Sequence, residues 1–199
     1  MKMNILAVGC CMCLSFATSV AYAQASNFKG PFGGILVSSV GSSTDINGSG
    51  PAFSTGAQTV LPTLEAGYNF ATTEKFVLGA SVTYDLAKTN GGNIATASLQ
   101  SDNHYSLNFK PGYAINDTTL LYATIGYNHR NATVTNAGNF PGYSFDGIGY
   151  GIGSMLMLNE SIYLRFELQK INYGSQSIQS GVSAQPSLTV GTIGVGYKF

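Results

Sequence analysis

The strongest constraint on the fold is an alternation of apolar and polar residues that runs from Leu64 to Leu86. Every second side chain between Leu64 and Phe70 is apolar, and the same period resumes at Phe76 after a short polar link at 71–75. A period of two indicates β-strands, because successive side chains of a strand point to opposite faces. The pattern therefore predicts a hairpin with one apolar and one polar face. Such a hairpin fits a soluble sandwich with a dry core, or a membrane barrel whose apolar face meets lipid.

The same alternation recurs along the chain and predicts eight strands. The first has its apolar residues Phe32 and Ile35 on opposite parities, so we expect a β-bulge near Gly33 and Gly34. Strands of this length match a tilted crossing of a bilayer. The expected strands are 28–39, 64–70, 76–86, 103–115, 119–131, 144–158, 161–173 and 187–199.

The links between these strands alternate in length. Bacterial outer-membrane barrels have short periplasmic turns and longer extracellular loops, whereas a soluble sandwich has no reason to sort its loops by length. The chain is therefore predicted to be all-β, an eight-stranded antiparallel up-and-down transmembrane β-barrel, with a soluble sandwich or lipocalin-like barrel as the alternative. Short links at 71–75, 116–118 and 159–160 alternate with long links at 41–55, 87–101, 132–143 and 174–185.

The N-terminal residues are typical of a secretory signal peptide. Lys2 precedes a mostly apolar stretch, an A-x-A cleavage motif ends at Ala23, and a second one ends at Ala25. Cleavage after Ala23 divides the chain into a signal peptide, 1–23, and a barrel domain, 24–199. All 3 cysteines lie in the signal segment, so no disulfide is expected in the mature chain.

The composition agrees with an exported membrane protein. Only 9% of the residues are charged, against about 25% in ordinary soluble domains. The chain has 25 glycines, 12 tyrosines and 11 phenylalanines, and its formal net charge is zero. It therefore has no basic field for nucleic acid. No spacing typical of a metal site or a nucleotide-binding loop occurs, so no metal or cofactor is expected.

The last strand carries a further pattern. Residues 194–199 alternate small or polar with apolar side chains and end on an aromatic residue, with Tyr197 and Phe199 on the apolar parity. This resembles the terminal strand of bacterial outer-membrane barrels. With the signal peptide and eight strands, the mature chain resembles the OmpA/OmpX-like and opacity-type surface proteins over its whole length. Because the chain stops at Phe199, we expect no periplasmic peptidoglycan-binding domain like that of full OmpA-type proteins.

The resemblance implies a location and partners. It implies the outer membrane of a Gram-negative bacterium, contact with outer-membrane lipid and lipopolysaccharide, and recognition of Tyr197 and Phe199 by the barrel-assembly machinery. We expect a monomer and no enzyme. The function is predicted to be structural, or to be surface interaction through four extracellular loops, as in opacity-type adhesins and surface antigens. The ligand of the loops stays open, and a narrow pore for ions or small solutes is the alternative.

Charged residues on the polar parity are expected to face the lumen. The interior of an eight-stranded barrel is just wide enough for side chains to fill, so these charges must be paired or hydrated. We predict a structural plug of ion pairs, with a gated ion path as the alternative. The predicted lumen residues are Glu65, Asp85, Lys110, Arg130, Arg165 and Glu167, and Glu65, Lys110, Arg165 and Glu167 are expected at its centre.

One motif points to catalysis. His104 and Ser106 have the H-x-S spacing of lipid A deacylases, in which a histidine activates a serine. Parity directs both side chains inward, the motif lies mid-chain, and no glutamate stands at a suitable distance, although Asp102 is near. A lipid A-modifying acyl hydrolase is therefore a remote alternative. His129 is interpreted as a rim residue.

Aromatic residues are expected in two girdles, where a ring keeps one edge in water. The girdle near the long loops comprises Tyr84, Tyr105, Tyr127, Tyr150 and Tyr173. The girdle near the short turns comprises Phe70, Phe76, Tyr113, Tyr122, Tyr163 and Phe199.

Overall fold

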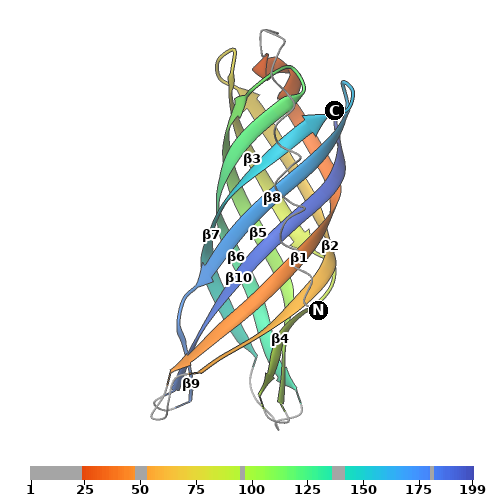
Figure 1. Cartoon of the computed structure of the whole chain (residues 1–199). Coiled ribbons are helices and arrows are strands. Elements are labelled where there is room, and N and C mark those ends of the chain that lie inside the picture. The colour runs from red at the N-terminus through yellow and green to blue at the C-terminus, as the bar shows by residue number, and fades with distance from the viewer. Residues whose placement is uncertain (1–23, 48–52, 95–96, 136–141, 180–181) are drawn as a thin grey trace, which may run out of the picture.

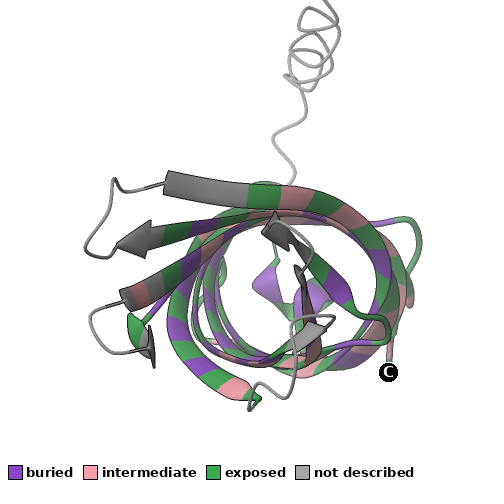
Figure 2. Ribbon diagram, turned by 90° about the horizontal axis from the view of Figure 1, so that it is seen from below, coloured by how far each residue is buried: buried purple, intermediate pink, exposed green. Residues whose placement is uncertain are grey.

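The architecture is a closed antiparallel β-barrel (Figures 1 and 2). The computed structural model describes residues 24–47, 53–94, 97–135, 142–179 and 182–199. Consecutive long strands are antiparallel neighbours, and β1 also pairs with β10, which closes the sheet and confirms the predicted eight-stranded up-and-down barrel. The long strands are β1 (Gly30–Asn47), β2 (Phe53–Ala71), β3 (Phe76–Asp85), β5 (Ala97–Ala114), β6 (Thr119–Thr135), β7 (Tyr143–Met157), β8 (Ile162–Tyr173) and β10 (Val182–Lys198).

Shorter elements lie at the ends of these strands. The strands β4 (Thr89–Ile94) and β9 (Gln176–Gln179) pair with β5 and β10, and the 3-10 turn η2 (Ala25–Phe28) precedes β1. Within the described ranges, no helix is long and apolar enough to cross a membrane.

The short links all lie at one end of the barrel, at the top of Figure 1. They span 72–75, 115–118 and 158–161. In two of them an asparagine, Asn116 or Asn159, accepts hydrogen bonds through its side-chain oxygen from backbone N–H groups two and three residues later. These are Asx turns, which reverse the chain within a few residues. We call this end the turn end, and the opposite end the hairpin end.

The long links predicted at 41–55, 87–101, 132–143 and 174–185 prove to be mostly strand. The pairing of β1 with β10 runs on to Asn47 and Ser183, and that of β5 with β6 runs to Ser98 and Thr135. Continued pairing satisfies the backbone hydrogen-bonding groups of these segments. Outside a membrane, neither face of a strand has to be apolar, so the sequence of these segments shows no alternation of apolar and polar residues. Parts of the predicted links, at 48–52, 95–96, 136–141 and 180–181, lie outside the described residues.

Apolar side chains cover the outside of the barrel. Large hydrophobic residues face outward from every long strand, with exposed fractions of 42% for Phe166, 51% for Ile193 and 49% for Val195. Across the described residues, no second sheet covers this face. Soluble monomers rarely expose a continuous apolar surface of this extent. The surface fits lipid, and it excludes the soluble alternatives, whose apolar faces form dry interiors.

The bulge predicted near Gly33 and Gly34 is wrong, because β1 pairs in unbroken register with both neighbours. Phe32 and Ile35 have opposite parities because they face opposite sides of the wall. Phe32 is buried inside and packs edge-on against Tyr163 with ring centroids 6.1 Å apart, whereas Ile35 is exposed outside.

A bulge occurs in β5 instead. Between Asp102 and Tyr105, β5 contains one residue more than the facing part of β6. Asn103 there has φ of 50°, a left-handed conformation that asparagine tolerates better than most residues. The extra residue reverses the parity of the strand, so that Ser101 and Ser106 are both buried.

Buried and exposed residues alternate along the strands in Figure 2. The buried side chains are apolar towards both ends of the barrel and polar between them. Along β8, for example, Tyr163 and Ile171 belong to opposite apolar clusters and flank Arg165 and Glu167. The turn-end cluster comprises Ala25, Phe28, Phe32, Val77, Ala114, Leu120, Tyr122, Met155, Met157 and Tyr163. The hairpin-end cluster comprises Val40, Leu61, Ala132, Phe145, Ile171, Tyr173, Leu188 and Val190.

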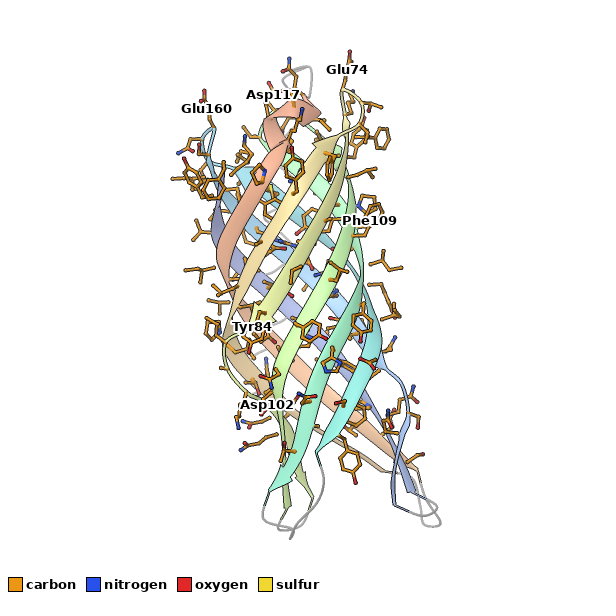
Figure 3. All side chains as sticks on the ribbon, turned by 180° about the vertical axis from the view of Figure 1, so that it is seen from behind. Glu74, Tyr84, Asp102, Phe109, Asp117 and Glu160 are labelled. Atoms are coloured by element: carbon orange, nitrogen blue, oxygen red, sulfur yellow. The ribbon has the colours of Figure 1, made fainter. Side chains whose placement is uncertain are left out.

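Most predicted girdle residues are exposed on the outer face, as Tyr84 is in Figure 3. The prediction is wrong for Tyr122, Tyr163 and Tyr173, which are buried inside the barrel. Each of the three has the same parity as the inward-facing residues of its strand. Parity therefore predicts their orientation correctly, whereas their position near a strand end does not.

Candidate functional site

Four charged side chains meet in the middle of the barrel. Lys110 Nζ on β5 lies 2.7 Å from Glu65 Oε1 on β2 and 3.5 Å from Glu167 Oε2 on β8. The Arg165 guanidinium, also on β8, forms ion pairs with both Glu65 and Glu167. Each carboxylate therefore faces both cations, and the four formal charges cancel. We call these four residues the central charge cluster.

The central charge cluster is withdrawn from water. Glu65, Lys110 and Arg165 are 4%, 6% and 2% exposed. A single charge at such a depth would lose its hydration without compensation, which is why buried charges occur in pairs or networks. The structure thus brings together the four residues that the sequence predicts at the centre of the lumen.

Tyr122 completes this cluster. Its hydroxyl accepts a hydrogen bond from Arg165 Nε at 2.8 Å and donates one to Glu167 Oε2 at 2.9 Å. The Lys110 ammonium and the Arg165 guanidinium lie 5.6 Å and 5.3 Å from the centre of its ring, within the range of cation–π attraction. Sequence reasoning assigned Tyr122 to a girdle, although its parity opposite Leu121 points it inward.

The glycines of β7 face large side chains of the neighbouring strands. A Cβ atom at Gly153 would lie 2.4 Å from the ring of Tyr122, and one at Gly149 would lie 2.7 Å from amide nitrogens of Asn128 and Gln169. The alternating glycines of this strand therefore give room to inward-facing residues of β6 and β8, and the space beside them is occupied.

Asp85 and Arg130, the other two predicted lumen residues, lie apart from the central charge cluster. Asp85 accepts a hydrogen bond from Thr63 Oγ1 at 2.7 Å, and its second carboxylate oxygen lies 2.7 Å from His104 Nδ1. The Arg130 guanidinium lies 5.4 Å from the centre of the Tyr173 ring. Arg130 also interacts electrostatically with Asp85, so these two predicted residues form a second group beside the central charge cluster.

His104 and Ser106 face inward, as parity predicts, but each is engaged elsewhere. His104 pairs with Asp85 on β3, and the Ser106 hydroxyl accepts a hydrogen bond from Asn108 Nδ2 at 2.7 Å. Asp102 lies instead 3.7 Å from Lys88. A serine buried in the wall of a narrow barrel offers no entry for a lipid substrate, so this geometry gives no support to acyl hydrolysis.

His129 lies on the outer face, as predicted for a rim residue. Its ring stacks on that of Tyr105 with centroids 5.0 Å apart, and its Nδ1 lies 2.7 Å from Asp146 Oδ1. Among the residues that the structure describes, no group of three or more histidine, cysteine or acidic side chains is placed to hold a metal ion.

Little free space interrupts the filling of the barrel. A cavity of about 40 Å³ lies beside the central charge cluster, lined by residues that include Thr63, Asp85, His104 and Arg165. That volume holds only a few water molecules. Bulky side chains of the turn-end and hairpin-end clusters lie beyond it in both directions. The described geometry is that of a filled lumen.

A family comparison agrees with this architecture. The family model described as "Outer membrane protein beta-barrel domain" matches residues 9–199. No curated protein matches the sequence significantly.

Solved structures share the fold at low sequence identity. Ail, the attachment invasion locus protein of Yersinia pestis, aligns with a TM-score of 0.53 and 18% identity over 86% of this chain and 99% of that one. Neisserial surface protein A aligns with a TM-score of 0.51 and 14% identity over 83% of this chain and 97% of that one. Both are similar to this chain in fold.

Proposed function

Because the chain belongs to the outer membrane protein β-barrel family, we propose that it is a non-enzymatic surface protein whose filled barrel serves as an anchor. In this proposal the hairpins at the hairpin end contact a ligand outside the cell. The chain is a protein of the outer membrane. The large hydrophobic side chains exposed on the outside of the barrel, which we call the apolar belt, contact lipid there. Phospholipid and lipopolysaccharide are the lipids we propose for the two leaflets, with the barrel as a monomer.

The observation that carries the proposal is the extension of strand pairing beyond the apolar belt. Past Val37, the outward-facing side chains of β1 are small or polar, and β1 stays paired with both β2 and β10. On the neighbouring strands, Gln58 and Thr189 are exposed on the same side. Paired strands hold these hydroxyl and amide groups in a fixed arrangement. Such a surface suits hydrogen-bonding ligands such as glycans or polar peptide segments.

The fold of the comparison proteins is compatible with this role. One of the similar structures is an attachment protein and another a surface protein by name. We propose the same general role, attachment at the cell surface, for this chain. The class of ligand rests on the polar hairpins alone.

Shortening one hairpin at a time tests the surface role. In one such variant, residues 45–54 are replaced by Asn-Gly, which joins the paired residues Thr44 and Thr55 in a two-residue turn. We expect the barrel still to fold, seen as heat-modifiable migration on a gel, while cells that display it lose adhesion to host-cell layers. The three other hairpins, shortened one at a time in the same way, show which of the four contact the ligand. Unchanged adhesion in all four variants would refute the proposal.

A filled lumen also predicts the absence of conductance. Ions crossing the barrel would have to displace the ion pairs of the central charge cluster and pass both apolar clusters. We therefore expect no discrete current steps in planar bilayers containing the purified protein. Steps that change in size with the Arg165→Met substitution would instead establish the pore alternative, because they would place the ion path at this cluster.

We further propose that Tyr197 and Phe199 form the assembly signal. They are 48% and 75% exposed on the outer face of the barrel, with ring centroids 4.9 Å apart. This position leaves both rings accessible to the barrel-assembly machinery.

A further inference from the structure

Residues at the start of the described chain enter the turn end of the barrel. Ala25 and Phe28, both in η2, are 0% exposed and belong to the turn-end cluster. The Ala25 N–H donates a hydrogen bond of 2.7 Å to the carbonyl of Glu74, and Asn69 Nδ2 donates one of 3.1 Å to the carbonyl of Phe28. This segment therefore forms part of the interior packing.

The residue before this turn points its backbone nitrogen at a carboxylate. The Gln24 nitrogen donates a hydrogen bond of 3.1 Å to Asp117 Oδ1, and Asn27 Nδ2 donates one of 3.2 Å to the Asp117 carbonyl. Each short turn carries one acidic residue, and Figure 3 shows Glu74, Asp117 and Glu160 together at this end. A positive charge at the Gln24 nitrogen would thus be electrostatically favourable.

The sequence offers two signal-cleavage motifs, and the structure separates them. Cleavage after Ala25 would remove a buried side chain and the hydrogen bonds of Gln24 and Ala25. Cleavage after Ala23 keeps all of them. We infer that the signal peptide is removed between Ala23 and Gln24, and that the new α-ammonium group of Gln24 pairs with the Asp117 carboxylate and fixes the mature N-terminus in the turn end.

The chemistry is hydrolysis of one peptide bond by a signal peptidase. Water adds across the bond between Ala23 and Gln24: its oxygen becomes part of a carboxylate on Ala23, and the nitrogen of Gln24 becomes an ammonium group. The amide N–H that meets Asp117 is thereby replaced by a charged donor, and a charge-assisted hydrogen bond is stronger than a neutral one.

The pairing has a chemical consequence. An N-terminal glutamine cyclises when its neutral α-amine attacks the side-chain amide carbon, forms a new C–N bond and releases ammonia. An ammonium group held by a carboxylate has no lone pair for this attack. The ion pair therefore slows the cyclisation of the N-terminal glutamine and its reaction with amine-directed reagents.

The first test is the intact mass of the protein purified from outer membranes. We expect the mass of residues 24–199 with an uncyclised glutamine. The mass of residues 26–199, or of the chain with its first 23 residues, would overturn the assignment of the cleavage site. This outcome is independent of adhesion, so it tests the N-terminus separately from the proposed surface role.

The second test is the rate at which an amine-reactive reagent labels the α-amine of the folded protein near neutral pH. Asp117→Asn keeps the size and the oxygen acceptor of the side chain but removes its charge. We expect labelling about two- to fivefold faster than in the unmodified protein, the factor that corresponds to an exposed ion pair. Glu160→Gln, in another short turn, is the matched control and should label at the unmodified rate. Equal rates for Asp117→Asn and the unmodified protein would overturn the ion pair.

Discussion

Replacing Glu65 by leucine is expected to lower the free energy of unfolding of the barrel by about 3–5 kcal/mol. Glu65 contacts both cations of the central charge cluster and is 4% exposed. Without it, Lys110 and Arg165 share the single carboxylate of Glu167, and one positive charge is left in the barrel without a counter-charge. Reversible unfolding in guanidinium chloride in the presence of lipid vesicles measures the change.

A paired substitution separates the uncompensated charge from the loss of packing. In the double variant Glu65→Leu with Arg165→Met, Lys110 still has Glu167 at 3.5 Å as its partner, and the charges cancel again. We expect the double variant to be more stable than Glu65→Leu alone, because removing an unpaired buried charge recovers free energy. A loss below about 1 kcal/mol in Glu65→Leu, the range of exposed pairs, would show that the cluster is hydrated and contributes little to stability.

The alternation of apolar and polar residues was sufficient to predict most of the central charge cluster. Glu65, Lys110, Arg165 and Glu167 come from three strands far apart in the chain, yet each lies on the polar side of its own alternation near a strand middle. In a closed barrel with in-register neighbours, such residues meet on the axis. Their convergence follows from a period of two and a narrow lumen, without any knowledge of side-chain contacts.

Features that depend on which residues are neighbours across strands were not predictable from one strand at a time. The contact of Asp85 with His104 joins β3 to β5, and the inward space for Tyr122 depends on Gly153 in β7. The entry of Phe28 into the barrel has no periodic signal, because a short turn has no repeating face. The extension of the strands at the hairpin end was not predicted for a related reason, because β-strands outside lipid need no apolar face.

Replacing Ile125 by arginine tests the medium that surrounds the barrel. Ile125 is 54% exposed on the outer face of β6, and its pairing partners Phe109 and Tyr150 are exposed on the same face. Along β6 it lies between the exposed residues Leu121 and Tyr127, within the apolar belt. An arginine at the midplane of a bilayer lowers the stability of a barrel by about 2–4 kcal/mol, and one near an interface lowers it by about 0–1 kcal/mol.

The matched control for this prediction is Val60→Arg. Val60 is 66% exposed on the outside of β2 and pairs with Ser39, where the outward side chains of β1 become polar. In lipid vesicles, we expect Ile125→Arg to lower the free energy of unfolding by at least about 2 kcal/mol. We expect Val60→Arg to lower it by less than about 1 kcal/mol. Because both variants add the same charge to an exposed aliphatic position, the difference between them reports depth in the bilayer. Equal small losses would mean that the outer face of Ile125 meets water, and the membrane-embedded barrel would be wrong.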